Sequence, residues 1–251
     1  MKLTDRMQAI CNLVTPGNRV CDVGCDHGYV PIYLVENGIS PAALAMDINK
    51  GPLEAAGENV NLHKLSDKIT LRLSNGLSKL ERNETETVII AGMGGKLVLS
   101  ILENAFSKIK DEAFGIKEFI LQPQSDIEYF RSKMTEYGFI PMAEDMILED
   151  GKFYPMTRYF YSGNKETVKK YFEKYGIDDE LINLYGLHLL CDKNEVLKAY
   201  LLKEQRHLAE VMEKLSNIAD EDSRKIRESQ IEEKRRINEK ALEIINRKEN
   251  L

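Results

Sequence analysis

The sequence predicts an α/β protein in which a sheet of alternating strands and helices ends in an antiparallel hairpin and is followed by long C-terminal helices. Three observations lead to this prediction. Strand-like apolar runs alternate with helical segments up to about residue 137, which is typical of a doubly wound parallel sheet. Two alternating runs then meet at Asp150-Gly151, a dipeptide that favours a tight hairpin turn. After Gly163 the strand pattern ends, and leucines recur at helical spacing.

Five β/α units are predicted before the hairpin. Strands are indicated by short apolar or alternating runs, and helices by apolar residues three or four positions apart. The predicted strands cover residues 19–23, 42–47, 69–73, 87–91 and 119–121. The predicted helices cover residues 4–14, 31–37, 52–62, 97–106 and 127–137. Because the run at 87–91 is largely β-branched and has no polar alternation, we expect it at the centre of the sheet.

The hairpin distinguishes between two classes of nucleotide-binding protein. Its strands are expected at residues 142–149 and 153–161, joined through Glu149-Asp150-Gly151-Lys152. The strands of a nicotinamide-dependent dehydrogenase stay parallel. An antiparallel addition after five β/α units instead favours the Rossmann-like sheet of class I methyltransferases.

The C-terminal third is predicted to be helical, with a sheet domain over residues 1–162 and a helical domain over residues 163–251. Short helices are expected over 165–190. A long helix then carries a seam, with Glu204 at one of its positions and with Leu197, Leu201, Leu208, Val211, Leu215 and Ile218. The segment 220–223 interrupts the pattern. A second charged helix follows with Ile237, Ala241, Leu242, Ile244 and Ile245.

Two such helices of about 23 residues would each be about 35 Å long and would form an antiparallel coiled-coil hairpin. One interpretation of this hairpin is a dimerisation surface or a solvated helix pair. The other is an arm that holds a large substrate. Neither the seam nor the charge pattern distinguishes between them.

Composition limits the range of functions. The net charge of −6 means that a nucleic-acid partner would require a local basic patch. The four cysteines, even with His27 beside Cys25, match no common zinc pattern, so we predict no metal site. No apolar run is long enough to span a membrane. The polar N-terminus and the few cysteines indicate a reduced, cytoplasmic compartment.

A glycine-bearing turn after the first strand indicates a nucleotide cofactor. The pattern Asp22-x-Gly24-x-Asp26-x-Gly28 lacks the G-x-G-x-x-G of dinucleotide-binding proteins. It looks like the D/E-x-G-x-G-x-G turn of class I methyltransferases, with Asp26 in place of the middle glycine. Glycines at such a turn let a cofactor lie against bare backbone. The alternative is that Asp22 and Asp26 are structural acids that hold the loop, Asp26 through His27 or backbone amides.

The tips of the second and third strands carry further polar groups. Asp47 ends the second strand, where a carboxylate can accept both hydroxyl hydrogens of a ribose. The alternative for Asp47 is a helix N-cap. Asn75-Gly76 follows the third strand, at the place where methyltransferases commonly bind the adenine amine, and the alternative is an ordinary Asn-Gly turn.

The fourth strand ends in Ala91-Gly92-Met93-Gly94-Gly95, where three glycines let a planar base approach the backbone. The Asn/Asp-Pro-Pro-Tyr/Phe signature of amino-methyltransferases is absent, and no Pro-Cys element supports Cys25 as a nucleophile. These absences favour a ring nitrogen as methyl acceptor. Its in-plane lone pair needs alignment, desolvation and an acceptor for the charge it gains, for which Asp26 is a candidate.

Together these residues resemble the bacterial tRNA (adenine-22-N1)-methyltransferase family, the TrmK type, over essentially the whole chain. The resemblance is carried by Leu3–Arg6, Asp22–Pro31, Gly51-Pro52, Asn75–Leu77, Ile90–Gly95, Leu121–Pro123 and Glu149–Tyr154. The sequence departs from the family pattern at Asn75, where members often carry Asp, and at Gly28, where they often carry Ala.

The resemblance implies S-adenosylmethionine as methyl donor, tRNA as partner and N1 of adenine 22 in the D-arm as target. The candidate catalytic residues are Asp26 and the loop residues Gly92, Met93 and Gly94. The candidate cofactor-binding residues are Asp22, Gly24, Asp26, His27, Gly28, Asp47, Ile48, Asn75, Gly76, Ala91 and Gly92. The candidate substrate-binding residues are Arg6, Tyr29, Pro31, Gln122, Pro123, Tyr154, Arg224, Lys225, Arg227, Lys234, Arg235 and Arg236.

Three alternative functions stay open at this point. They are a methyltransferase for another RNA base or a small molecule, a nucleotide-binding oxidoreductase, and a non-catalytic RNA-binding adaptor. The oligomeric state is also open, with a monomer favoured.

Overall fold

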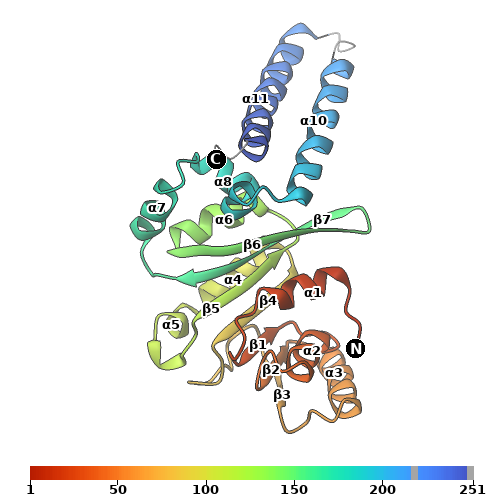
Figure 1. The fold of residues 1–251 in the computed structure, drawn as a ribbon, viewed down its shortest axis with the longest axis vertical. Coiled ribbons are helices and arrows are strands. Elements are labelled where there is room, and N and C mark those ends of the chain that lie inside the picture. The colour runs from red at the N-terminus through yellow and green to blue at the C-terminus, as the bar shows by residue number, and fades with distance from the viewer. Residues whose placement is uncertain (216–219, 248–251) are drawn as a thin grey trace.

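The computed structural model describes residues 1–215 and 220–247 (Figure 1). Its sheet has seven strands in the order β3-β2-β1-β4-β5-β7-β6. The strands are β1 Val20–Val23, β2 Ala43–Asp47, β3 Ile69–Leu73, β4 Thr87–Met93, β5 Glu118–Pro123, β6 Phe139–Glu149 and β7 Lys152–Tyr161. The first five are parallel, whereas β7 runs antiparallel to both β5 and β6. The predicted sheet with a terminal antiparallel hairpin is confirmed.

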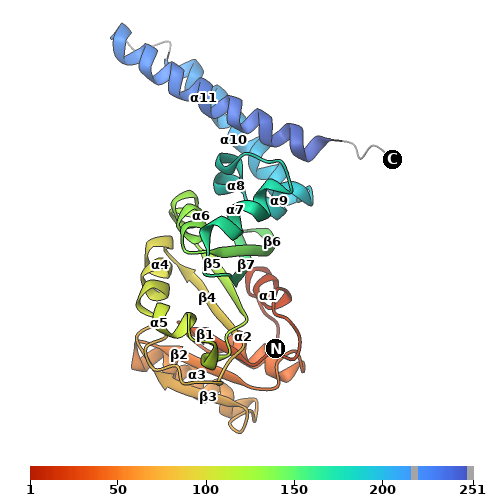
Figure 2. The same cartoon turned by 90° about the vertical axis from the view of Figure 1, so that its left-hand side faces the viewer.

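Helices cover both faces of the parallel part of the sheet (Figure 2). These helices are α1 Asp5–Asn12, α2 Tyr29–Glu36, α3 Lys50–Leu62, α4 Gly95–Asn104, α5 Phe106–Ile109, the 3-10 turn η1 Glu112–Phe114, and α6 Ile127–Glu136. Strand β4 explains why two layers form, because Val88 and Ile90 pack with α4 and α6 on one face while Ile89 packs with α1 and α2 on the other. The single helix predicted over 97–106 is wrong in detail, because α4 ends at Asn104 and α5 starts separately after Ala105.

In the part of the chain that the structure describes, five helices follow the sheet: α7 Lys165–Glu173, α8 Asp179–Tyr185, α9 Leu187–Cys191, α10 Glu195–Leu215 and α11 Glu221–Asn246. Helices α10 and α11 lie side by side and antiparallel, and extend away from the sheet (Figure 1). The interruption predicted at 220–223 is too long, because residues 221–223 already belong to α11. Asp220 is the N-cap of this helix, and its carboxylate accepts a hydrogen bond from the Ser223 N–H. Ile218 of the predicted seam lies outside the described residues.

The base of the α10–α11 hairpin is packed on both helices, whereas at its far end the buried residues are Leu208 and Leu215 of α10 among the described residues. Leu197 and Leu201 of α10 are buried against Ile237 and Ala241 of α11. Between residues 221 and 236, however, no described residue of α11 is buried. We call residues 205–215 and 221–236 the distal hairpin. The knobs-into-holes packing of a coiled coil stays a prediction.

Glu204, at the polar position of the predicted seam, gathers hydrogen bonds at the base of the hairpin. Its carboxylate accepts from the Asn238 amide at 2.9 Å and from the Tyr185 and Tyr200 hydroxyls at 2.8 and 3.4 Å. Asn238 is fully buried and also donates to the Leu201 carbonyl. A buried polar set of this kind fixes the register of two helices, because any slip would leave its members unpaired.

A buried ion pair joins the helices to the sheet. Arg131 of α6 and Glu144 of β6 lie 3.4 Å apart with side chains that are 6% and 1% exposed. Arg131 also donates to the Leu184 carbonyl, and Glu144 accepts from the His188 N–H at 2.8 Å. The predicted boundary at residue 162 falls between β7 and α7, but a division into two independent domains stays a prediction.

Candidate active site

A cavity of about 230 Å³ lies at the carboxyl ends of β1 and β4. We call it the strand-end cavity. Four segments contribute to its walls: α1, the turn from β1 into α2, the tip of β4, and the residue after β5. Its lining residues are Arg6, Met7, Ile10, Asp22, Gly24, Cys25, Asp26, His27, Tyr29, Val30, Ala91, Gly92 and Gln124. Ligands of open α/β sheets bind at this edge, next to the strand where the winding direction reverses.

The turn after β1 is shaped by three residues with positive φ. Gly24 has φ of 77°, Asp26 of 49° and Gly28 of 73°. A Cβ on Gly24 would lie 2.2 Å from the Cε of Met93, so glycine allows the tips of β1 and β4 to touch. Aspartate is among the few residues that tolerate the left-handed region, which explains how Asp26 replaces a glycine here.

Asp22 presents an unpaired carboxylate to the cavity. Its residue is 6% exposed, and among the described residues it has no hydrogen-bond or ion-pair partner. Burial, together with the nearby charge of Asp47, raises the pKa of Asp22 to about 7. A buried acid without a partner is costly, so the arrangement fits a ligand that brings a cationic group into this cavity.

Asp26 differs from Asp22 because its side chain is 69% exposed at the rim. The Nε2 of His27 lies 3.7 Å from the Oδ1 of Asp26, which is too far for a hydrogen bond but within ion-pair distance when the imidazole is protonated. The His27 ring in turn stacks on Tyr29, with 5.5 Å between ring centroids and 22° between planes. Of the two pairings expected for a structural acid, the contact with His27 is present and a hydrogen bond from a backbone amide is absent among the residues described, so most of the Asp26 carboxylate is open to a ligand.

Asp47 is not the N-cap of α3, since that residue is Asn49, and its role toward a ribose stays a prediction. Asp47 is 8% exposed, and one carboxylate oxygen accepts a hydrogen bond from the Asn49 N–H at 2.8 Å, just before α3. The other oxygen has no partner among the described residues. Ile48, 60% exposed, and the exposed Asn75, followed by Gly76 with φ of 54°, continue this edge along β2 and β3. These residues lie outside the lining of the strand-end cavity and extend the candidate site past Asp22.

A β-bulge forms the tip of β4. The register with β5 shifts between Ala91 and Met93, so the N–H of Gly92 leaves the ladder and donates to the Gln122 side-chain oxygen at 3.1 Å. Gly92 has φ of 79° and is exposed. A Cβ on Gly95 would lie 2.5 Å from the Ser125 carbonyl, so this glycine lets α4 start directly beside the loop after β5.

Three predicted substrate-binding residues are buried instead. Gln122 is 0% exposed, and both Pro31 and Pro123 are buried. The Gln122 amide is bonded within the protein at both ends, since its oxygen accepts from Gly92 and Arg6 and its nitrogen donates to the Pro123 carbonyl. The prediction of direct substrate contact is therefore wrong for these residues. They lie on or next to elements that border the cavity, where close packing excludes a substrate.

Arg6 and Tyr154 do come together at the site. The Arg6 guanidinium lies 5.4 Å from the Tyr154 ring centroid, and Nη1 donates to the Gln122 oxygen at 3.2 Å. Glu149 accepts from the Arg6 backbone N–H at 3.1 Å and lies 3.8 Å from its Nε. Sequence reasoning treated Glu149 only as part of the hairpin turn. It also missed Gln124, whose position directly after β5 was the available signal.

The thiols near the site do not support nucleophilic chemistry. Cys25 is 6% exposed, and burial together with Asp22 raises the pKa of its thiol far above its usual range. Burial likewise raises the pKa of Cys11 to about 12. Within residues 1–215 and 220–247 there is no group of side chains that could hold a metal ion, and no helix is long and apolar enough to cross a membrane.

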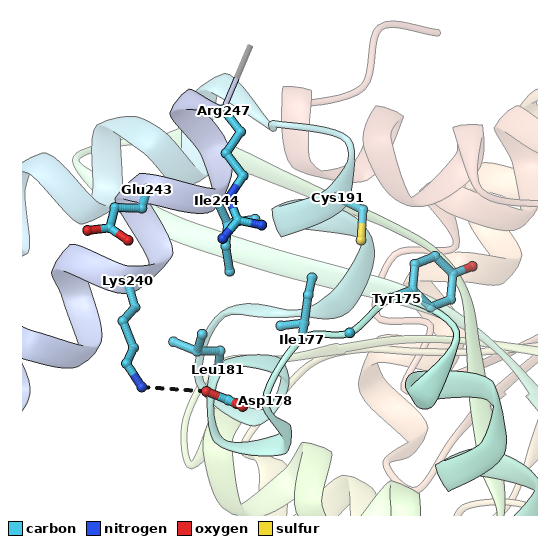
Figure 3. Close-up of a pocket in the computed structure, with 10 residues that line it drawn as sticks. Tyr175, Ile177, Asp178, Leu181, Cys191, Lys240, Glu243, Ile244 and Arg247 are labelled. Carbon is cyan, nitrogen blue, oxygen red and sulfur yellow. Dashed lines mark ion pairs between the residues drawn. The ribbon is translucent and has the colours of Figure 1, made fainter. Parts of the chain in front are cut away.

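A larger cavity of about 460 Å³ lies far from the strand ends, between the α7–α8 loop, α9 and the end of α11 (Figure 3). Its apolar side chains are Ile177, Leu181 and Ile244, and Lys240 forms an ion pair with Asp178 at 3.5 Å. No buried, unpartnered carboxylate faces it among the described residues. The strand-end cavity is therefore the better candidate for chemistry.

The six basic residues predicted to bind substrate from α11 fall into two groups. Four form ion pairs within the helix: Arg224 with Glu228, Lys225 with Glu221, Arg235 with Glu239, and Arg236 with Glu233. Arg227 and Lys234 form none with any described residue. Seven positions apart, these two side chains lie on the same face of α11.

Comparisons with known proteins agree with this geometry. A family model described as "Methyltransferase domain" matches residues 3–157. The tRNA (adenine(22)-N(1))-methyltransferase of Bacillus subtilis is 30% identical over 225 residues, which is 90% of each chain. The crystal structure of the B. subtilis M1A22 tRNA methyltransferase TrmK has a TM-score of 0.78 at 28% identity, covering 96% of this chain and 99% of that one. A Streptococcus pneumoniae structure in complex with S-adenosyl-L-methionine has the same score and identity, covering 96% and 100%.

Proposed function

The chain belongs to the tRNA (adenine(22)-N(1))-methyltransferase family, and we propose that it transfers a methyl group from S-adenosylmethionine to N1 of adenine 22 in the D-arm of tRNA. The observation that carries this proposal is the strand-end cavity, where an unpaired, buried Asp22 lies close to the bulged, exposed tip of β4. This cavity offers a cationic donor a counter-charge and a planar base a bare backbone surface.

The residues at the strand ends fit the donor. When bound, S-adenosylmethionine supplies an electrophilic methyl group on a positively charged sulfonium. Asp22 would compensate positive charge on the donor, and the free oxygen of Asp47 would accept hydrogen bonds from the ribose. The exposed Ile48 side chain and the Asn75 amide are suited to the face and the edge of the adenine ring.

The target base is proposed to leave its stack and to enter beside Gly92, Met93 and Gly94. The stacked rings of His27 and Tyr29 at the rim offer an aromatic surface on which an unstacked base can rest. Adenine N1 attacks with its own lone pair, so the protein has to align it and exclude water. The exposed carboxylate of Asp26 would then stabilise the positive charge that the ring acquires.

The distal hairpin is proposed to hold the body of the tRNA. Helix α11 has 26 residues and is therefore about 39 Å long, enough to reach well beyond the cavity. Arg227 and Lys234 carry this role, because their charges are not neutralised within the helix. A cytoplasmic location and a monomer are the states that this function favours.

The proposal is tested with a tRNA transcript that carries adenine at position 22 and a matched transcript with guanine there. After incubation with S-adenosylmethionine, nucleosides are mapped by mass spectrometry. We expect 1-methyladenosine at position 22 of the first transcript and no methylation of the second. Tight tRNA and donor binding without any methyl transfer would instead favour the RNA-binding adaptor, and methylation elsewhere would favour a different RNA base.

A further inference from the structure

Arg6 is fixed at the edge of the strand-end cavity from three directions. Gln122 accepts from its Nη1 at 3.2 Å, a Glu149 carboxylate oxygen lies 3.8 Å from its Nε, and the Tyr154 ring lies 5.4 Å from its guanidinium carbon. A long side chain at the surface normally samples many rotamers, and ordering it on binding costs affinity. Holding Arg6 in place beforehand reduces that cost for whatever the guanidinium binds.

Most of the hydrogen-bonding capacity of Arg6 is left unused. A guanidinium has five N–H donors, and among the described residues only Nη1 makes a side-chain hydrogen bond. The acceptor is a neutral amide, and the nearest carboxylate oxygen, on Glu149, is 3.8 Å from Nε. Because the side chain is 21% exposed and lines the cavity, its free donors are open to a ligand.

The cavity therefore presents a carboxylate without a partner and a cation that is paired with Glu149 on one side only and keeps free N–H donors. Asp22 is a buried carboxylate without a partner, and Arg6 is a cation with free donors. An amino-acid moiety has a cationic ammonium and an anionic carboxylate on the same carbon, so it matches such a pair. A nucleotide phosphate at the mouth of the cavity would match Arg6 alone.

Gln122 connects this cation to the target loop. The same oxygen that accepts from Arg6 also accepts from the Gly92 N–H, which the β-bulge has released from the ladder. The position of the guanidinium and the conformation of the β4 tip thus depend on one buried amide. Gln122 acts as a positioning residue for both.

We infer that Arg6 is the anion-binding residue of the site, set by Gln122, and that it takes either the α-carboxylate of the donor or a phosphate beside the target nucleotide. This inference rests on the proposed function. Through Arg6, helix α1 would bind an anionic group of the ligand directly. The glycine-bearing turn and the strand tips form the rest of the donor site.

The test compares two ligands that differ in one group. S-adenosylhomocysteine contains the amino-acid moiety, and 5′-methylthioadenosine has the same adenosine and thioether without it. Binding of each is measured by calorimetry for the wild-type protein, Arg6→Met and Arg6→Gln. Arg82→Gln is the control, because Arg82 is an exposed arginine paired with Asp111 away from the cavity. Affinity for full-length tRNA is measured as a function of salt for the same four proteins.

If Arg6 binds the donor carboxylate, both variants lose about 10- to 100-fold in affinity for S-adenosylhomocysteine and keep their affinity for 5′-methylthioadenosine. If it binds a phosphate, affinity for S-adenosylhomocysteine is kept, tRNA binding weakens, and its salt dependence falls by about one charge. Unchanged binding of S-adenosylhomocysteine and tRNA by either folded variant overturns the inference.

Failure of the inference is separable from failure of the proposed function. A wild-type protein that binds neither adenosine ligand would contradict the methyltransferase proposal itself. Arg6→Met keeps the apolar stem over Tyr154 and Arg6→Gln keeps a hydrogen-bond donor, so a folding defect in one variant leaves the other to decide. Gln122→Leu should cause a smaller binding loss than the Arg6 variants, because the guanidinium is still present but no longer held by the Gln122 oxygen.

Discussion

The strand-end cavity and the distal hairpin differ in how their charged side chains are buried and paired. In the cavity a few charged groups are buried or held in place and keep bonding capacity for a ligand: Asp22 has no partner among the described residues, and Arg6, whose Nε lies 3.8 Å from Glu149, keeps free N–H donors. Along α11 most charges are exposed and paired within the helix, as for Lys225 with Glu221. A buried unpaired charge lowers the stability of the folded protein and is retained where a ligand uses it. Ion pairs at the surface change the stability of the protein little. The comparison therefore assigns methyl transfer to the cavity and tRNA binding to the hairpin.

The largest effect is expected at Asp47. Asp47→Ala removes an acceptor for two ribose hydroxyls and should weaken binding of S-adenosylhomocysteine by about 3 kcal/mol, or roughly 150-fold, while tRNA binding is kept. Calorimetry measures the loss, with Asp67→Ala as the control because Asp67 is an exposed acid just before β3, outside the site. Equal affinity in Asp47→Ala and wild type would leave Asp47 with only its hydrogen bond from the Asn49 N–H.

Asp26 should separate turnover from binding. Asp26→Asn keeps the size of the side chain and removes its charge, so we expect kcat to fall about 100-fold while donor and tRNA affinities stay the same. Single-turnover methylation at saturating tRNA measures this. If kcat survives and only the melting temperature falls, Asp26 is a structural residue of the turn and the β4 tip acts by positioning alone.

Within the hairpin, unpaired and paired cations should differ. Replacing both Arg227 and Lys234 with glutamine should weaken tRNA binding about 10-fold and lower its salt dependence by about two charges, with no change in donor affinity. The matched control is the double variant Lys225→Gln with Arg236→Gln, whose charges are already paired. Equal losses in the two double variants would mean that ion pairing within α11 does not decide which residues bind RNA.

The smallest effect concerns stability and pH. Because burial raises the pKa of Asp22 to about 7 from its ordinary value of 3.8, the folded protein without ligand binds this proton more tightly than the unfolded chain. The stabilising contribution of this proton is therefore present at low pH and is lost as the pH rises through about 7. Asp22→Asn should raise the melting temperature of the unliganded protein by about 3 °C or more at pH 8, and by less at pH 5. An equal shift at both pH values would contradict the unpaired state of Asp22.

The same contrast explains what the sequence could predict. The order of strands, the hairpin and the residues of the β1–α2 turn follow from local patterns, because a parallel sheet brings the carboxyl ends of its strands to one edge. Gln122 and Pro123 could not be assigned in this way. Their burial depends on the bulge at Gly92 and on Arg6, which is 116 residues away from Gln122. A run of basic residues also does not reveal which of them are paired, since that depends on rotamers along the helix.

Shortening the hairpin tests directly whether methyl transfer and tRNA binding are carried by separate parts of the molecule. Replacing residues 209–230 with a short Gly-Ser linker removes most of the distal hairpin and keeps Glu204, Asn238 and the packed base. The informative measurement is the single-turnover rate of methyl transfer at saturating tRNA, with S-adenosylhomocysteine affinity measured alongside. We expect both to stay within about twofold of the wild type, while the tRNA concentration needed for saturation rises at least tenfold. A loss of donor affinity, or a slow transfer step at saturating tRNA, would show that the distal hairpin also takes part in donor binding or methyl transfer.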